Sequence, residues 1–190
     1  MPHIHTAQGW HDQTVSAYIL RYEERWDGTF TAPRLLVHMH KKFGVLLQPG
    51  GHVELPENPW QAIAHELLEE TGYEMDQLGL FQPEILKVQR MTYPTTILHP
   101  IPFYMNSYDA GENNHRHTDH AYVFLTAEEP RRQPGEGEST DLRWLTLDEV
   151  MATPADQISE VVKDAAPVAF SLISSAQWKL VSPLSFRTTV

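Results

Sequence analysis

The part of the sequence that most constrains the fold is residues 49–73, where a glycine turn leads into a helix with clear start and stop signals. Asn58 is a good N-cap, Pro59 suits the first helical position, and Gln61 stands where a capping box takes Glu or Gln. Gly72 is typical of the left-handed residue that ends a helix. The segment therefore predicts a glycine loop followed by a short helix with defined ends.

Three carboxylates of this helix, Glu66, Glu69 and Glu70, occupy positions i, i+3 and i+4 and so share one face. Like charges at this spacing oppose helix formation unless something positive lies over them. A hard cation such as Mg²⁺ takes oxygen ligands, and substrate phosphates often complete its shell. Before the helix, Gly50 and Gly51 leave backbone groups uncovered for close approach to a ligand. The spacing therefore predicts a cation site.

The full run is Gly51, five residues, Glu57, seven residues, and then the sequence His-Glu-Leu-x-Glu-Glu-x-Gly-Tyr over residues 65–73. It resembles the signature of the Nudix hydrolases and differs at one defined position, where the family has Arg and this chain has His65. Residues 47–54 are also similar to a bacterial Nudix subgroup. The resemblance implies an α/β fold, an α/β/α sandwich around a mixed sheet. It also implies hydrolysis of a phosphoanhydride in a nucleoside diphosphate linked to another group.

The resemblance further implies roles for individual positions. Glu66, Glu69 and Glu70 would hold Mg²⁺ or Mn²⁺, and the carbonyl of Gly50 would be a further ligand. Any of the three glutamates can act as the general base, with Glu66 the first choice and Glu69 the second. The positions that would support the motif, with Glu57 bracing the loop, are Gly51, Glu57, His65 and Gly72.

His65 leaves three interpretations open. Arg is charged at every relevant pH, whereas His is charged only when protonated, a form that acidic neighbours favour. We therefore expect His65 to replace the Arg and the enzyme to be active. The first alternative is a catalytically weak Nudix domain that binds a nucleotide for regulation. The second is a Nudix-type isomerase that acts on a small diphosphate.

A second motif, His115-x-His117-x-Asp119, precedes an apolar strand, so its alternate residues share a face if the chain is extended there. With Tyr122 it is similar to a Nudix subgroup. In one interpretation the motif reaches the cleft and contacts phosphate, binds an additional metal or acts as a base. In the other it is an exposed polar loop. A dedicated zinc site lacks an obvious fourth ligand. The substrate-binding candidates are His52, Glu54, His117 and Asp119.

The charge distribution points to a small anionic ligand that needs a cation. The net charge is −11, so the chain lacks the basic footprint of a protein that binds nucleic acid stably. Residues 43–86 contain eight acidic residues and no Lys or Arg. A polyanionic substrate would be repelled here unless metal ions bridge it to the protein. The expected partner is therefore a small nucleotide or diphosphate together with Mg²⁺ or Mn²⁺.

The 190 residues predict an N-terminal arm over 1–13, a Nudix hydrolase domain over 14–152, and a helical extension over 153–190 that packs on the same domain. Strands are expected at 14–23, 34–40, 85–89, 99–108, 120–126 and 142–145. Helices are expected after a Thr146 cap and over 158–173, the latter broken or kinked near Pro167. The absence of cysteine, of a signal peptide and of a membrane-length apolar run predicts a cytoplasmic protein. The oligomeric state stays open, a homodimer included.

Overall fold

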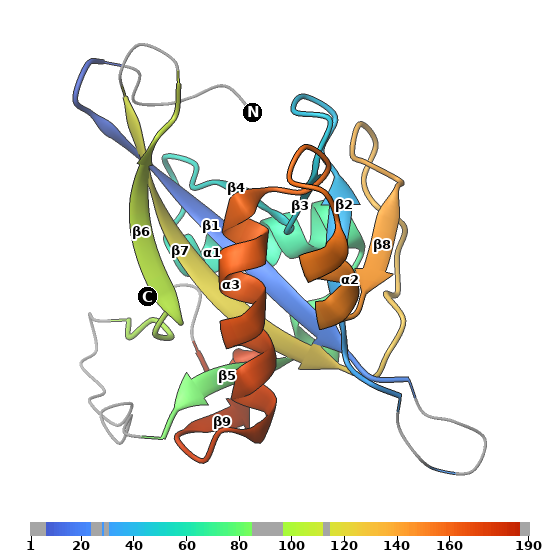
Figure 1. Cartoon of the computed structure of the whole chain (residues 1–190). Helices are drawn as coiled ribbons and strands as arrows, with labels where there is room; N and C mark the ends of the chain where they lie inside the picture. The colour runs from blue at the N-terminus through green and yellow to red at the C-terminus, as the bar shows by residue number, and fades with distance from the viewer. Residues whose placement is uncertain (1–6, 24–27, 29–30, 85–96, 112–114, 187–190) are drawn as a thin grey trace.

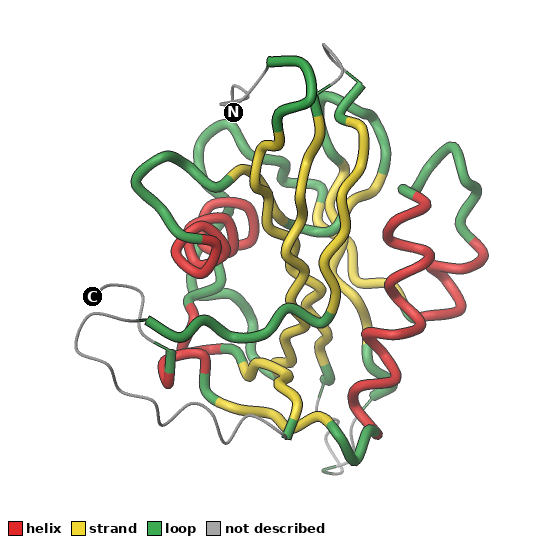
Figure 2. Tube along the Cα trace, turned by 90° about the vertical axis from the view of Figure 1, so that its left-hand side faces the viewer, coloured by secondary structure: helices red, strands yellow, loops and turns green. Residues whose placement is uncertain are grey.

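A computed structural model describes residues 7–23, 28, 31–84, 97–111 and 115–186. Within these ranges one mixed sheet lies between helices on its two faces (Figures 1 and 2). The strands are β1 (His11–Arg21), β2 (Arg34–Met39), β3 (Leu46–Leu47), β4 (Gly50–His52), β5 (Gly79–Pro83), β6 (Tyr104–Asp109), β7 (Arg116–Thr126), β8 (Leu142–Leu145) and β9 (Trp178–Val181). The α-helices are α1 (Pro59–Glu66), α2 (Leu147–Ala152) and α3 (Glu160–Ser171).

The sheet order is β3-β2-β1-β7-β5-β9, with β4 paired to β1, β6 to β7 and β8 to β2. The central pair, β1 and β7, is parallel over eleven residues, and the other pairs are antiparallel. Apolar side chains of β1 alternate between the two faces, as the period of a strand requires. Val15, Ala17 and Ile19 join the core beneath α1, whereas Tyr18 and Leu20 join the core beneath α3. The α/β/α sandwich around a mixed sheet is confirmed.

Helix α1 begins as the sequence predicts. The Asn58 side chain accepts hydrogen bonds from the Trp60 and Gln61 N–H groups, each at 3.0 Å, and the capping box is complete. Gly72 ends the segment at φ 75°. Between these ends the helix is not regular, because residues Leu67–Thr71 form a π-turn after Glu66. The π-turn is a difference from the single helix that was predicted, and such turns are frequent at functional sites.

Two strands extend further than the sequence indicates. β1 begins at His11, inside the predicted arm, and β7 begins at Arg116, inside the predicted polar segment. The parallel pairing explains both differences, because His11 pairs with Arg116 and the ladder continues from there. β5 and β9 were not predicted, and the expected strand over 85–89 lies outside the described residues.

The C-terminal helices cover the face of the sheet opposite α1 (Figure 2). The predicted Thr146 cap of α2 is present, with Glu149 completing the capping box. α3 continues through Pro167, so the helix is not broken there, and a kink at this position stays a prediction. Pro167 is exposed, and Val162, Ala165, Ala166 and Ala169 anchor the other side of the helix in the core. Among the described residues, no helix has the length and apolar character needed to cross a membrane.

Candidate active site

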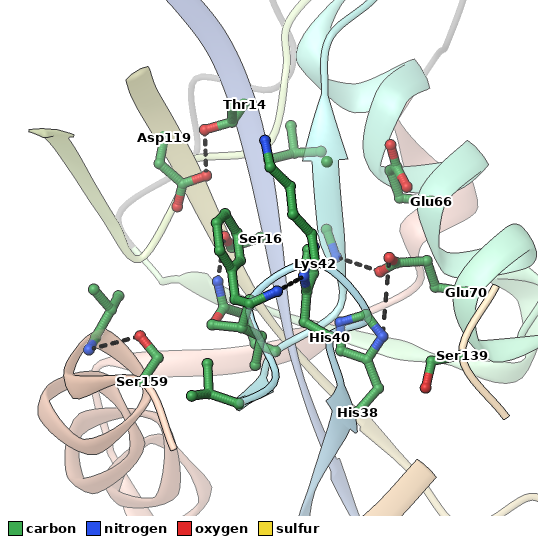
Figure 3. A pocket seen from close by; sticks show the side chains of 18 of the residues that line it. Thr14, Ser16, His38, His40, Lys42, Glu66, Glu70, Asp119, Ser139 and Ser159 are labelled. Carbon is green, nitrogen blue, oxygen red and sulfur yellow. Dashed lines mark hydrogen bonds and ion pairs between the residues drawn. The ribbon is translucent and has the colours of Figure 1, made fainter. Parts of the chain in front are cut away.

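Residues 66–70, which carry the three carboxylates, are here called the acidic turn. A cavity of about 690 Å³ lies where this turn, the glycine loop and the polar ends of β1 and β7 meet (Figure 3). Its size falls within the usual range of small-molecule sites. The predicted residues that line it are Gly50, Gly51, His52, Glu66, Glu69, Glu70, His117 and Asp119. Glu54 is not among the lining residues, so its predicted place in the substrate site is not supported by its position.

Two glycines bring the loop into close contact with its neighbours. The Gly50 N–H donates a hydrogen bond to Glu70 Oε2 at 2.7 Å. A Cβ on Gly50 would overlap the carbonyl oxygen of Val15, and one on Gly51 would overlap the Glu66 carboxylate. Gly50 therefore needs to be glycine, because a side chain would meet the backbone of β1, whereas a side chain at Gly51 would require the Glu66 carboxylate to move.

Glu66 and Glu70 are buried, with 5% and 7% of their surface exposed. Burial raises the pKa of Glu66 to about 7 and that of Glu70 to about 8, and the charges of neighbouring carboxylates, Glu138 included, add to both shifts. Glu66 Oε1 is buried and has no hydrogen-bond partner in the described part of the chain. A buried acceptor beside a second carboxylate fits a hard divalent cation, whose charge would favour both ionised forms.

Glu69 is more exposed than its neighbours and is held by His65. His65 Nε2 lies 3.0 Å from Glu69 Oε1, and His65 Nδ1 lies 3.3 Å from Glu57 Oε1. Partial burial lowers the pKa of His65, but the hydrogen bond and charge of Glu69 outweigh it, and the net shift is upward. The other Glu57 oxygen accepts from the Glu54 N–H at 3.4 Å. The imidazole thus links the carboxylate that braces the loop to one on the acidic turn.

The second motif forms part of a buried strand, so the exposed-loop interpretation is wrong. His115, His117 and Asp119 are at most 9% exposed. Thr14 Oγ1 donates to Asp119 Oδ1 at 2.9 Å, which joins β1 to β7 (Figure 3). Burial raises the pKa of Asp119, and the hydrogen bonds from Thr14 and Ser16 oppose that rise. His117 and Asp119 therefore line the cavity, whereas His115, which is buried just before β7, does not.

Sequence reasoning missed several cavity residues. His38 is 3% exposed, and its Nδ1 lies 3.9 Å from Glu70 Oε1 (Figure 3). Burial lowers the pKa of His38 to about 4, and the nearby His40 adds to the effect, so the ring is neutral. Lys42 and Glu138 also line the cavity. The alternation of His38 and His40 at the end of the strand predicted over 34–40 was an available signal for His38.

Comparisons with known proteins agree with this geometry. The model of the NUDIX domain family matches residues 10–165. A solved structure of a NUDIX-family hydrolase from Clostridium perfringens is 27% identical and covers 85% of this chain and 97% of its own, with a TM-score of 0.67. No curated protein matches the sequence.

Two more distant structures share the fold. An Ap4A hydrolase from C. elegans is 16% identical over 86% of this chain and 93% of its own, with a TM-score of 0.52. The NUDIX domain of Shewanella oneidensis NrtR, complexed with ADP ribose, is 15% identical over 85% of this chain and 88% of its own, with a TM-score of 0.55. At these identities the likeness establishes the architecture alone.

Proposed function

The chain belongs to the Nudix family, since the model of the family's domain matches residues 10–165. From this membership we propose which reaction the residues of the cavity catalyse. The protein is a Nudix pyrophosphohydrolase. Its reaction is the divalent-metal-dependent cleavage of a phosphoanhydride in a nucleoside diphosphate linked to another group. The observation that carries this proposal is the buried pair Glu66 and Glu70, which contacts the glycine loop and lies next to a Glu69 that His65 holds in place.

The carboxylates are the donors for Mg²⁺ or Mn²⁺. Glu66, Glu69 and Glu70 would hold the ion, together with the carbonyl of Gly50. Such an ion neutralises charge on phosphate oxygens and lowers the pKa of a bound water. The unpartnered Glu66 Oε1 and the acidic surroundings support this assignment, because a cation compensates for both.

Glu66 is the proposed general base. It lines the cavity, its carboxylate is buried, and its Oε1 has no hydrogen-bond partner in the described part of the chain, so that oxygen can accept a proton from water. Glu69 is the second candidate, because its carboxylate also faces the cavity. Glu70 is less suited to this role, since it already accepts the Gly50 N–H.

His65 supports hydrolysis over a regulatory domain without turnover. The ring spans Glu57 and Glu69 at 3.3 and 3.0 Å, so it makes two carboxylate contacts of the kind that an Arg can make. Such contacts to the acidic turn favour a site kept in order for turnover. We therefore assign His65 as a positioning residue.

The other lining residues and the structural neighbours indicate which phosphate compounds to test as substrates. His52, His117 and Asp119 line the cavity beside the carboxylates, as expected of the predicted substrate-binding residues. Lys41 and Lys42 also line it. The structural neighbours named for Ap4A hydrolysis and for an ADP ribose complex suggest dinucleoside polyphosphates and ADP-ribose as the first compounds to test.

A panel assay tests the proposal. Nucleoside triphosphates, nucleotide sugars, ADP-ribose and dinucleoside polyphosphates are incubated with Mg²⁺ or Mn²⁺, and phosphate-containing products are measured. We expect hydrolysis of at least one class by the wild type, none without metal, and loss of activity in Glu69→Gln. His120→Gln, on the same strand as His117 but bonded to Gln13 at 2.8 Å, is a matched control that stays active.

The panel also separates the alternatives. Nucleotide binding without product under all metal conditions would contradict hydrolysis and favour the regulatory domain. Turnover of an isoprenoid diphosphate, with no nucleotide hydrolysed, would favour the isomerase. A cytoplasmic location, the absence of stable nucleic-acid binding and the division at residues 13 and 152 all stay predictions, and the oligomeric state stays open.

A further inference from the structure

Two imidazoles and a carboxylate outside the acidic turn converge at one point of the sheet. Asp12 comes from β1, His52 from β4 and His117 from β7, and one ligand atom of each lies within 4.8 Å of the others. Asp12 is 1% exposed and His117 is 9% exposed. Burying a carboxylate is costly unless positive charge or hydrogen bonds compensate for it. The group therefore has the composition and the burial of a built site.

The spacing of the imidazoles matches shared coordination of one ion. His52 Nε2 lies 3.3 Å from His117 Nε2. Two nitrogens bound to one tetrahedral ion at the usual Zn–N length of ~2.0–2.1 Å lie about 3.3–3.4 Å apart. His52 Nε2 is also 3.9 Å from Asp12 Oδ2. All three ligand atoms lie within 4.8 Å of one another, so one ion among them can bind the two nitrogens and an oxygen of Asp12.

The backbone and a phenol hold these side chains in place. Asp12 is the register neighbour of His117 in the parallel β1–β7 ladder, and β4 pairs with β1 so that His52 lies opposite Thr14. The Tyr108 hydroxyl lies 3.1 Å from His117 Nδ1. If Nε2 of His117 binds an ion, its Nδ1 carries the proton and donates to the phenol oxygen, which fixes the tautomer.

We propose that Asp12, His52 and His117 form a second cation site, separate from the carboxylate cluster, that takes a first-row transition-metal ion such as Zn²⁺. Imidazole suits these ions, whereas Mg²⁺ prefers oxygen ligands. Three protein ligands leave at least one coordination position for water or a substrate oxygen. The sequence offers no obvious fourth zinc ligand. In an open site of this kind a fourth protein ligand is not needed, because water or substrate takes that position.

The proposed ion would share the cavity with the carboxylates. His52 and His117 line the same cavity as Glu66, Glu69 and Glu70. A cation at the imidazoles adds positive charge to an acidic cavity, and its open position suits an anionic oxygen such as that of a phosphate. The cavity therefore offers an oxygen-donor site and a nitrogen-donor site to one ligand.

Zn²⁺ binding measured in the presence of millimolar Mg²⁺ tests the proposal without any assay of activity. Isothermal titration calorimetry gives affinity and stoichiometry, and Co²⁺ in place of Zn²⁺ reports the ligands by visible absorption. We expect one Zn²⁺ per wild-type chain. His52→Gln and His117→Gln should each weaken binding by at least about 10-fold, and Tyr108→Phe by about 10-fold as the loss of an orienting contact.

Two variants control for the location of the site. His120→Gln, on the same strand as His117, should bind Zn²⁺ like the wild type, and so should Glu70→Gln, because its carboxylate belongs to the other cluster. Thermal unfolding verifies that each variant is folded. Wild-type affinity in both His52→Gln and His117→Gln, or loss of Zn²⁺ binding in Glu70→Gln alone, would overturn the proposal. Hydrolysis with Mg²⁺ can succeed or fail independently of this result.

Discussion

His65 holds two carboxylates with one ring, which an imidazole can do only while both of its nitrogens carry protons. Its contacts to Glu57 and Glu69, at 3.3 and 3.0 Å, join the loop before α1 to the π-turn after it. An Arg can make the same two contacts without depending on pH. The His at this position therefore makes the geometry of the site sensitive to proton concentration.

We expect His65→Ala to lower kcat/KM by about 10- to 100-fold, the usual effect of losing a contact that orients a ligand. His65→Arg should stay within a few-fold of the wild type, or exceed it. The net upward shift in the pKa of His65 means that both N–H groups are present below that pKa and that one is lost as the pH rises through it. The ratio of wild-type to His65→Arg activity should therefore fall at alkaline pH.

Steady-state kinetics over a pH series, on a substrate found in the panel, check this prediction. A constant ratio of wild-type to His65→Arg activity across the series would show that the protonation of His65 does not matter. A large loss in a folded His65→Arg would show that the two side chains are not equivalent here.

The glycine loop and the C-terminal end of α1 depend on each other as elements. Gly51 lies so close to Glu66 that a Cβ would overlap its carboxylate, whereas a Cβ on Gly135 would make only ordinary contacts, the nearest at 3.5 Å from the Glu69 carbonyl oxygen. We expect Gly51→Ala to displace Glu66 and to reduce kcat by about 100-fold, because misplacement by about 1 Å has an effect of that size. Gly135→Ala should leave kcat nearly unchanged. Equal kcat values in the two folded variants would contradict this.

The local elements could be predicted from sequence because their signals are local. Asn58, Pro59 and Gln61 specify the start of α1, and Gly72 its end, through contacts within a few residues. The π-turn could not be predicted, since the spacing of Glu66, Glu69 and Glu70 is compatible with a regular helix.

The remaining site residues depended on pairing between distant segments. Asp12 was assigned to a loose arm because nothing near it in sequence reveals that it pairs with His117 across the parallel β1–β7 ladder. Polar residues alternate at Asp12, Thr14 and Ser16 as they do over residues 115–119. The two patterns indicate a shared site only once the strands are known to be neighbours. The carboxylate part of the site was therefore predictable, and the histidine part was only partly so.

Across the whole molecule, two buried carboxyl groups link stability to pH and to metal. The folded-state pKa values of Glu66 and Glu70, about 7 and about 8, lie above the ordinary value of 4.5. The folded state therefore favours the protonated forms. Their contribution to stability is present below the ordinary pKa and is lost as the pH rises through the folded-state values. A bound cation offsets this loss of stability at high pH, because it favours the ionised forms of the two carboxyl groups.

We therefore expect the Tm of the metal-free protein to fall between about pH 6 and about pH 9, and the rise in Tm on adding Mg²⁺ to be larger at the higher pH. At 100 times its Kd, Mg²⁺ should stabilise the fold by about 2.7 kcal/mol. Thermal unfolding with Mg²⁺ or with EDTA measures both effects. Glu66→Gln should reduce the dependence on pH and on Mg²⁺. A Mg²⁺ effect that is equal at both pH values, or unchanged in Glu66→Gln, would argue against this linkage.

Buried carboxylates that contact the glycine loop serve a metal-dependent hydrolysis in our proposal. The substitution Glu66→Gln tests this most directly, because it keeps the shape of the side chain and removes its charge. The measurement is the single-turnover rate of phosphoanhydride cleavage at saturating Mg²⁺, on the best substrate of the panel, for the wild type and the folded variant. We expect the single-turnover rate to fall on the order of 10²- to 10⁴-fold, as when a general base is removed. Cleavage by Glu66→Gln at the wild-type rate would contradict it.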